Sequence, residues 1–440
     1  GYNAGDGGTT SAPFSSGENN TALGYQALVG FTTATRMVAI GYESMHNVTT
    51  GADSVAIGYQ AAYYDVGTES VSIGSYAGMA NGAGSNVSIG FRAGSTSTGG
   101  SNTAIGASAI RYLNAGNENT AIGNTAGSYL LGTQTTIVGS QAGRFASGSS
   151  NTFVGMSAGY GGTTSAPFSS GESNVAVGKS ALAGFTTGYS NTVMGTNAGD
   201  AITSGYENAL FGQGAGGALT DGHDNVMIGQ VAGGTSTSVG QAVIIGEFAG
   251  YANLTSAADG VVLIGAGAGR NLTTGAGNIA IGYASMLQHT TGARNIAIGY
   301  SAMDDTNAGS TSQGSSDNVF IGYSAGGGVW ANAASNFNVA IGTYAMDANL
   351  NGALYNVAIG QDALTNLISG DNNTAVGNSA GNGLTTGAQN QYFGMYTGFY
   401  NQTGNNNVGI GYGALQGISG KSASSNTAIG HVSLYNIVGD

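Results

Sequence analysis

A five-residue motif of the form Asn-(Thr/Val/Ile)-Ala-Ile-Gly recurs through the whole chain and constrains its fold more than any other feature. The glycine that closes the motif returns mostly after about 16 to 17 residues. This period is too short for an ankyrin, tetratricopeptide or propeller unit, so each repeat can supply only one coil of a β-solenoid. Clean copies of the motif occupy residues 102–106, 119–123, 278–282, 295–299, 356–360 and 426–430.

Each motif is a short apolar run bounded by Asn and Gly, which is typical of a brief strand between turns. Helical periodicity is absent. At about 5 residues per strand, one repeat holds two strands and two turns. The sequence therefore predicts an all-β protein, a parallel β-solenoid that forms a flat two-layer roll with two short strands per coil. Stacking of the coils predicts an elongated rod.

The two faces of each predicted strand are both apolar or small. Thr103 and Ile105 share one face, and Ala104 and Gly106 share the other, because side chains alternate along a strand. A strand that is apolar on both sides is normally covered on both sides. One face can fill the interior, and the small Ala and Gly residues of the other would let a neighbouring backbone approach closely. This pattern predicts a homo-oligomer.

The asparagine that opens the motif is interpreted as a stacked turn residue. Asn tolerates the left-handed turn conformation, and a column of side-chain amides can hydrogen-bond from coil to coil. A calcium-binding roll would instead need a repeated Gly-Gly-x-Gly-x-Asp frame, which the chain lacks. The predicted structural ladder comprises Asn102, Asn119, Asn278 and Asn295 with Ile105, Ile122, Ile281, Ile298, Gly106, Gly123, Gly282 and Gly299.

Composition argues against several classes of function. With 8 Lys and Arg in 440 residues and a formal net charge of −13, the chain lacks the basic surface that nucleic acid or an anionic membrane attracts. No run of about 20 apolar residues could insert into a bilayer. There is no cysteine, and the four histidines are dispersed without metal-ligand spacing, so they are interpreted as solvated turn residues.

Motifs for catalysis or cofactors give no better support. With so few His and Lys, a Ser nucleophile would have few bases to activate it. Residues 212–217 and 265–269 approach the dinucleotide-binding fingerprint, but both lie in the repeat frame with no helix expected after them. We therefore expect that the protein is not an enzyme and has no cofactor and no metal.

Aromatic residues and long loops are the candidate contact sites. The chain is expected to be one continuous array over residues 1–440, with insertions near 2–19, 156–173, 303–317 and 325–336. Residues 7–18 recur unchanged as 161–172, which indicates duplication of a block of coils. Trp330, the only tryptophan, either pins its own loop or stacks on a sugar. Tyrosines after motif glycines should form an interrupted ladder of ligand contacts: Tyr25, Tyr42, Tyr59, Tyr283, Tyr300 and Tyr323.

The repeats resemble the head repeats of trimeric autotransporter adhesins, whose units read close to Ser-Val-Ala-Ile-Gly, as at residues 54–58. They also resemble the Gly-Tyr-x-Ala repeats of phage and virus tail-fibre proteins, as at 24–27 and 322–325. The resemblance covers essentially the whole chain, although the repeat here is longer than that of the adhesins. It implies a left-handed β-roll that assembles as a homotrimer and mediates attachment to cells, matrix or glycans.

The expected function is that of an extracellular, cell-surface or virion-surface fibre segment that attaches to a surface glycan or protein. A purely structural filament or spacer without its own ligand is the main alternative. An ice-binding solenoid is a further one, because Thr-Thr-Gly recurs at 49–51, 273–275, 290–292 and 385–387. Gly1 is expected to lie inside a repeat, and the 440 residues to be a segment of a longer chain.

Overall fold

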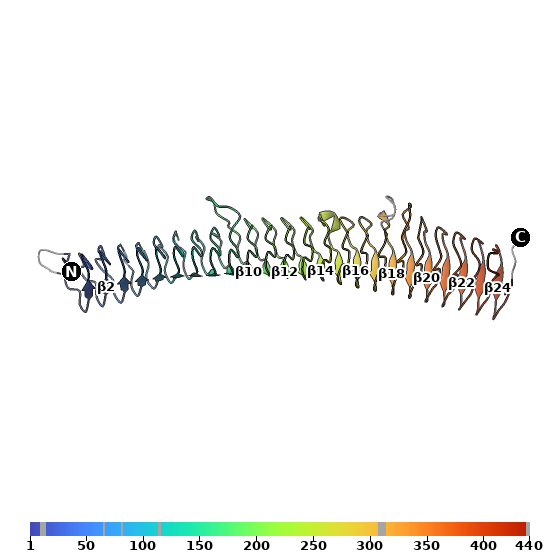
Figure 1. Cartoon of the computed structure of the whole chain (residues 1–440), viewed down its shortest axis with the longest axis horizontal. Helices are drawn as coiled ribbons and strands as arrows, with labels where there is room; N and C mark the ends of the chain where they lie inside the picture. Colours follow the sequence, from blue (N-terminus) through green and yellow to red (C-terminus); the bar gives the residue numbers. More distant parts are fainter. Residues whose placement is uncertain (9–14, 65–66, 81, 113–115, 307–313, 437–440) are drawn as a thin grey trace. The chain divides into compact units, whose positions relative to one another are not determined.

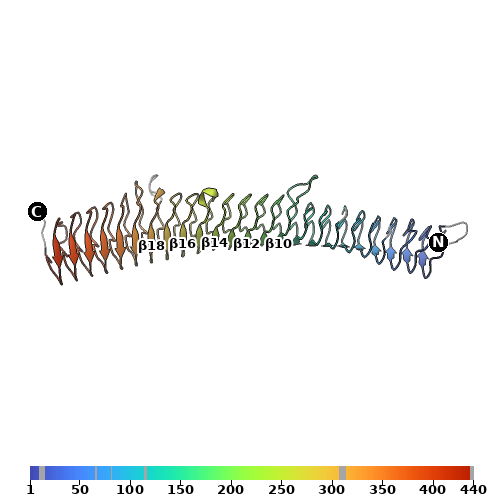
Figure 2. The same cartoon turned by 180° about the vertical axis from the view of Figure 1, so that it is seen from behind.

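A computed structural model describes residues 1–8, 15–64, 67–80, 82–112, 116–306 and 314–436. The chain forms two units, Gly1–Asp221 and Gly222–Asp440. Within each unit the backbone winds through successive coils, and each strand is three residues long. Figure 1, and Figure 2 from behind, show the strands of each unit side by side along one edge of the coils.

The strands recur at the predicted motif positions. Those of the first unit are β1 (Thr21–Leu23), β2 (Val38–Ile40), β3 (Val55–Ile57), β4 (Val71–Ile73), β5 (Val87–Ile89), β6 (Thr103–Ile105), β7 (Thr120–Ile122), β8 (Thr136–Val138), β9 (Thr152–Val154), β10 (Val175–Val177), β11 (Thr192–Met194) and β12 (Ala209–Phe211). Those of the second unit are β13 (Val226–Ile228), β14 (Val243–Ile245), β15 (Val262–Ile264), β16 (Ile279–Ile281), β17 (Ile296–Ile298), β18 (Val319–Ile321), β19 (Val339–Ile341), β20 (Val357–Ile359), β21 (Thr374–Val376), β22 (Gln391–Phe393), β23 (Val408–Ile410) and β24 (Thr427–Ile429), with one 3-10 turn, η1 (Ser256–Ala258).

Each strand pairs in parallel with the next strand of its unit, and the pairing keeps equivalent motif positions opposite each other. Ala104 of β6 lies opposite Ala121 of β7, and Ala280 of β16 lies opposite Ala297 of β17. The insertions do not shift this register, because Val175 after the long loop still pairs with Thr152. The predicted all-β parallel solenoid is confirmed.

The side of the coil opposite the strand is a ladder of turns. In the second coil Glu43 and Met45 have φ of 51° and 52°, whereas Ser44 between them does not have a positive φ. The backbone N–H of Glu43 donates to Tyr25 O (2.8 Å) in one neighbouring coil, and that of Met45 donates to Ala61 O (2.9 Å) in the other. The coils therefore keep their hydrogen bonds to each other on this side. A backbone in which every second residue has a positive φ is not an extended strand, however. The prediction of two strands per coil is wrong for this reason.

The narrow interior takes the small face of the strand. In β6, Ala104 is buried, whereas Thr103 and Ile105 point outward and are partly exposed. The prediction that the small Ala and Gly face would meet a neighbouring chain is therefore wrong at the alanine. The larger β-branched residues form the outer face of the sheet instead.

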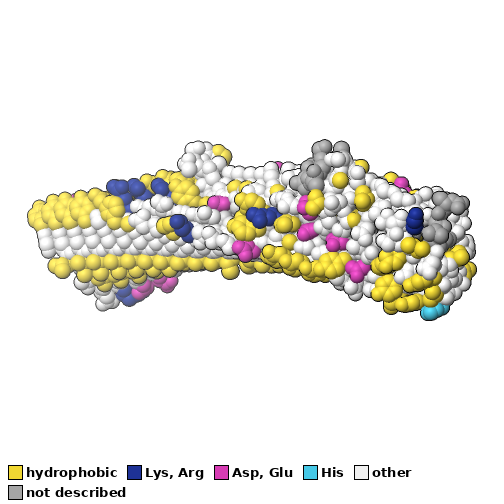
Figure 3. All heavy atoms as spheres, turned by 45° about the vertical axis from the view of Figure 1, so that its right-hand side comes forward, with side chains coloured by type: hydrophobic (Ala, Val, Ile, Leu, Met, Phe, Trp, Pro, Cys, Tyr) yellow, Lys and Arg dark blue, Asp and Glu magenta, His cyan; other side chains and the backbone are white. Residues whose placement is uncertain are grey.

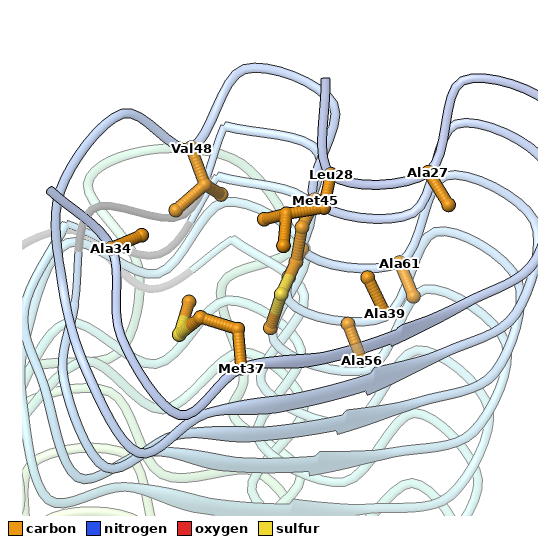
Figure 4. Close-up of a cluster of buried hydrophobic side chains, with 10 residues drawn as sticks. Ala27, Leu28, Ala34, Met37, Ala39, Met45, Val48, Ala56 and Ala61 are labelled. Atoms are coloured by element: carbon orange, nitrogen blue, oxygen red, sulfur yellow. The ribbon is translucent and has the colours of Figure 1, made fainter. Parts of the chain in front are cut away.

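Side-chain volume is balanced across the interior of some coils. Where the middle residue of the strand is Ala39, the opposite side supplies Met45, and both are buried (Figure 4). Where the middle residue is Phe320, the equivalent opposite position is Gly326, at which an added Cβ would collide with the phenyl ring. Interiors are close-packed, so in these coils one large residue is matched by one small residue across the interior.

Buried asparagines form columns that run from coil to coil. The Oδ1 atom of Asn278 accepts hydrogen bonds from the backbone N–H (2.9 Å) and the side-chain N–H (3.1 Å) of Asn295. Asn295 also donates to the backbone carbonyl of Ser315 (2.9 Å). The same pattern joins Asn102 to Asn119 in the first unit. Because these amides are shielded from water, each lost partner would leave a buried polar group unsatisfied.

The left-handed residue of this turn is the one before the asparagine. Ser101, Glu118 and Arg294 have φ between 58° and 59°, and Gly277 has φ of 70°. Asn itself was expected to tolerate this conformation, and that part of the interpretation is wrong. The side chain of Asn is needed inside the coil, so the exposed residue before it makes the reversal.

Candidate functional site

Exposed tyrosines of the first unit form a stacked row. The rings of Tyr2, Tyr25, Tyr42 and Tyr59 have successive centroid distances of 5.7, 5.0 and 5.2 Å and interplanar angles of 7–15°. Tyr76 continues the row edge-on, at 71° to Tyr59. Tyr25, Tyr42 and Tyr59 each follow a motif glycine directly, whereas Tyr76 lies one residue further along its coil. Parallel coils about 4.8 Å apart hold consecutive rings in contact.

A second row of tyrosines lies in the second unit. Tyr283 stacks on Tyr300 (5.1 Å), which stacks on Tyr323 (5.3 Å). Tyr344 then packs edge-on against Tyr323, at 84°. The structure therefore brings the predicted tyrosines together in two separate rows, one in each unit.

Stacking decides what these tyrosine rows can offer a ligand. Most ring faces are covered by the neighbouring ring, so ring edges and hydroxyl groups are what remains exposed. A hydrogen bond with Glu43 raises the pKa of the Tyr42 phenol, and partial desolvation raises the pKa of Tyr59. An open ring face is expected only at the end of a row.

The outer face of each sheet is the second candidate surface. In the strands of the described residues, the outward positions hold Thr, Val, Ile, Leu, Met, Phe, one Ala and one Gln, and no charged residue. The predicted ladder residues Ile105, Ile122, Ile281 and Ile298 belong to this outer face. On the side that Figure 3 draws, hydrophobic side chains form rows that cross successive coils. Parallel sheets are usually covered on both faces, so such a surface is unusual in contact with water.

The predicted ligand contact at Trp330 is wrong. Trp330 is fully buried, its indole N–H donates to Gly326 O (3.0 Å), and its ring packs edge-on against Phe320 at 5.5 Å. A ring that is closed off on all sides cannot stack on a sugar. Trp330 pins its own loop to the coil, which was the other interpretation of this residue.

The insertions differ in how they sit on their coils. In the insertion near 156–173, Phe168 packs against Tyr129 (5.0 Å) and Phe145 (6.0 Å), so this loop is anchored by an aromatic cluster. Residues 9–14 of the insertion near 2–19 lie outside the described residues. They include the phenylalanine that corresponds to Phe168 in the duplicated block. Residues 307–313 of the insertion near 303–317 also lie outside them.

His289 is a buried residue that the sequence interpretation placed in solvent. Its Nδ1 lies 2.8 Å from Thr306 Oγ1, and its Nε2 lies 3.0 Å from Gly292 O and 3.3 Å from Asn295 Nδ2. Burial lowers the pKa of His289 to about 4. The interpretation of all four histidines as solvated is therefore wrong at this position. The His289 ring thus adds a polar contact to the asparagine column at Asn295.

We expect His289 to make the folded protein less stable as the pH falls from about 6.5 to about 4. In this window unfolded His289 takes up a proton and folded His289 does not, so acid favours the unfolded state by up to about 3 kcal/mol. Thermal unfolding of the wild type and of His289→Gln between pH 7.5 and pH 4.5 would measure this effect. The His289→Gln contribution should differ from that of the wild type across this window, whereas His46→Gln, which removes a partly exposed imidazole, should change the slope less. Equal slopes for wild type and His289→Gln would contradict the prediction.

Comparisons and residue clusters define the remaining limits of the site. No protein-family model matches the chain, and no curated protein matches it significantly. Among the described residues, no three or more His, Cys, Asp or Glu side chains gather as metal ligands. None of the helical segments in that part of the chain has the length and apolarity needed to cross a membrane. The tyrosine rows and the outer sheet faces are thus the principal candidate surfaces.

Proposed function

We propose that this chain is a segment of an extracellular or virion-surface fibre that assembles with copies of itself and attaches to a glycan-bearing surface. The observation that carries the proposal is the uncharged outer face of each sheet. Such faces remain out of water when another apolar surface covers them. A second copy of the same chain presents the same face at the same spacing of coils, which makes it a geometrically matched partner.

The finer form of the proposal follows the resemblance to trimeric adhesin heads and tail fibres. A homotrimer of left-handed β-rolls would bring three outer faces together around one axis. The tyrosine rows would then stay at the periphery, where edges and hydroxyls can contact a polymer. Tyr supplies contact area at a low cost in side-chain entropy, and the surrounding Ser, Asn and Thr supply hydrogen bonds.

Attachment can be tested with the purified 440-residue chain on immobilised polysaccharides. We expect saturable binding to at least one polysaccharide, because repeated weak contacts along a repeat array add up through multivalency. Binding should weaken when Tyr25, Tyr42 and Tyr59 are replaced together by Ser. A chain that binds no polysaccharide saturably would contradict attachment and favour the spacer function.

A spacer function is supported by one specific observation, the unchanged recurrence of residues 7–18 as 161–172. Copying a block of coils lengthens a solenoid without building a new site. Ice binding has less support, since Thr273 and Thr385 donate their hydroxyl groups to the carbonyls of Thr290 (3.1 Å) and Gln402 (2.9 Å). Those donors are already used within the coils.

A further inference from the structure

A hollow of about 260 Å³ opens on the second unit at the start of its tyrosine row. Its lining comes from three successive coils, those of β14, β15 and β16. The residues that line it are Glu247, Phe248, Ala266, Gly267, Arg270, Tyr283, Ala284 and Leu287. Sites for drug-sized ligands measure about 300–1,000 Å³, so this hollow has the size for a single small ring.

The hollow exists because the coil of β15 carries only a methyl group and a hydrogen where its neighbours carry larger side chains. Directly after its motif glycine, the coil of β14 carries Glu247 and Phe248, and the coil of β16 carries Tyr283. The intervening coil carries Ala266 and Gly267 at the same two positions, within the glycine-rich run 265–269. The floor is held by backbone hydrogen bonds, from Gly267 N to Glu247 O (2.9 Å) and from Ala284 N to Ala266 O (3.0 Å). The floor of the hollow is therefore held in place by the hydrogen-bonded ladder between the coils.

Tyr283 contributes an open aromatic face to this hollow. One face of its ring is covered by Tyr300, while the preceding coil has only the methyl group of Ala266 at the equivalent position. Tyr283 is accordingly more exposed (57%) than Tyr300 (50%) or Tyr323 (46%). A ring face at the end of a stacked row can receive the C–H face of a sugar, which covered rings cannot do.

Polar groups of both signs border the same hollow. The guanidinium of Arg270 lies over the rings of Phe248 and Tyr251, 5.3 and 5.9 Å from their centroids, which fixes its position. Among the described residues Arg270 makes no ion pair, whereas Arg36 and Arg294 pair with Asp53 and Asp317. The exposed carboxylate of Glu247 can accept hydrogen bonds, and Arg270 can donate them.

We infer that this hollow binds one neutral pyranose ring of a surface polysaccharide, stacked on Tyr283 and hydrogen-bonded by Arg270 and Glu247. The inference rests on the proposed attachment function and names its ligand class. A neutral sugar fits better than an acidic one, because Glu247 and Arg270 offset each other's charge in the wall and the chain carries a net charge of −13. Bordering donors and acceptors match the hydroxyl groups of such a ring.

The test fills the hollow with a side chain that the repeat already uses at this position. Ala266→Tyr extends the row Tyr283–Tyr300–Tyr323 by one ring, and other coils carry Tyr after the motif glycine, so the variant should fold. Ala107→Tyr places the same side chain after Gly106 in the first unit, away from the hollow, and is the matched control. The probes are the methyl glycosides of glucose, galactose, mannose and N-acetylglucosamine, with glucuronic acid as the acidic comparison. Methyl NMR signals of Leu287 in the wall report binding.

We expect at least one neutral glycoside to shift the Leu287 signals saturably in the wild type and in Ala107→Tyr. Ala266→Tyr should weaken this binding about tenfold or more, as should Tyr283→Leu, which serves if the first variant folds poorly. Unchanged affinity in both variants, or binding of glucuronic acid alone, would overturn the inference. Polysaccharide binding that persists while no glycoside shifts Leu287 would also overturn it and leave attachment standing. Wild type that binds no polysaccharide at all would defeat the proposed function as well.

Discussion

Replacing Gly282 by Ala is expected to destabilise the second unit by about 3 kcal/mol or more. Gly282 has φ of +134°, a conformation that residues with a Cβ rarely adopt, and an added Cβ would overlap the carbonyl oxygen of Gly299 in the next coil. The clash is with backbone that is itself hydrogen-bonded, so it cannot move aside without breaking the coil-to-coil ladder. Thermal unfolding followed by circular dichroism would measure the loss.

Gly260 provides the matched control for this substitution. It also has a positive φ, +74°, but an added Cβ would meet no atom within 4 Å. Gly260→Ala should therefore cost only the conformational penalty, about 1 kcal/mol. Equal losses at Gly282 and Gly260 would show that close approach of the coils is not what requires glycine in the motif.

Lysine on the outer sheet face is expected to disrupt assembly and leave each chain folded. Ile298 and Ile359 point outward from β17 and β20 and are partly exposed, so Ile298→Lys with Ile359→Lys leaves the interior of the coils unchanged. In an assembled fibre the same charges would be buried without partners, at a cost of several kcal/mol each. Sedimentation velocity should show a shift to the monomer.

Two lysines placed elsewhere in the same unit control for added charge. Ala257 and Ala276 are exposed and lie outside the strands, in η1 and in a turn. Ala257→Lys with Ala276→Lys should sediment like the wild type. A monomer from both pairs, or an assembly that survives both, would argue against the outer face as the contact surface.

The sequence predicted the fold well because each coil repeats the same local requirements. The motif glycine marks the place where coils approach most closely, and the asparagine marks a buried column, so their spacing alone indicated a parallel solenoid. The tyrosine rows followed from the same spacing, because equivalent residues in successive coils lie side by side. These features depend on position in the repeat and on little else.

What the sequence did not predict depends on packing across the coil. The predicted number of strands per coil was wrong because positive φ at residues such as Glu43 and Met45 turns this segment away from an extended strand. The pattern of apolar residues in the sequence does not distinguish such a segment from a strand. The predicted orientation of Ala104 was wrong because both faces of the strand are apolar in sequence, so the pattern does not show which face points inward. Trp330 and His289 are buried because their loops fold back onto the coils, and no local motif predicts that.

The hollow at Ala266 and Gly267 could have been found from the sequence. Aligning the coils on their motif glycines shows that Ala266 lies between Glu247 and Tyr283. In the same alignment Gly267 follows Phe248 of the preceding coil. The likeness of this glycine-rich run to a dinucleotide fingerprint does not reveal the hollow, because such a motif ignores what the adjacent coils contribute. In a solenoid, a missing side chain is informative only beside the coils that stack on it.

The central claim is that the uncharged outer faces of the sheets are covered by further copies of the chain. The most direct test is the solution mass of the purified 440-residue chain, measured by multi-angle light scattering across a range of concentrations. The account predicts a stable mass of at least twice 43.1 kDa, and three times 43.1 kDa if the resemblance to trimeric fibres holds. A monodisperse particle of 43.1 kDa at all concentrations would contradict it.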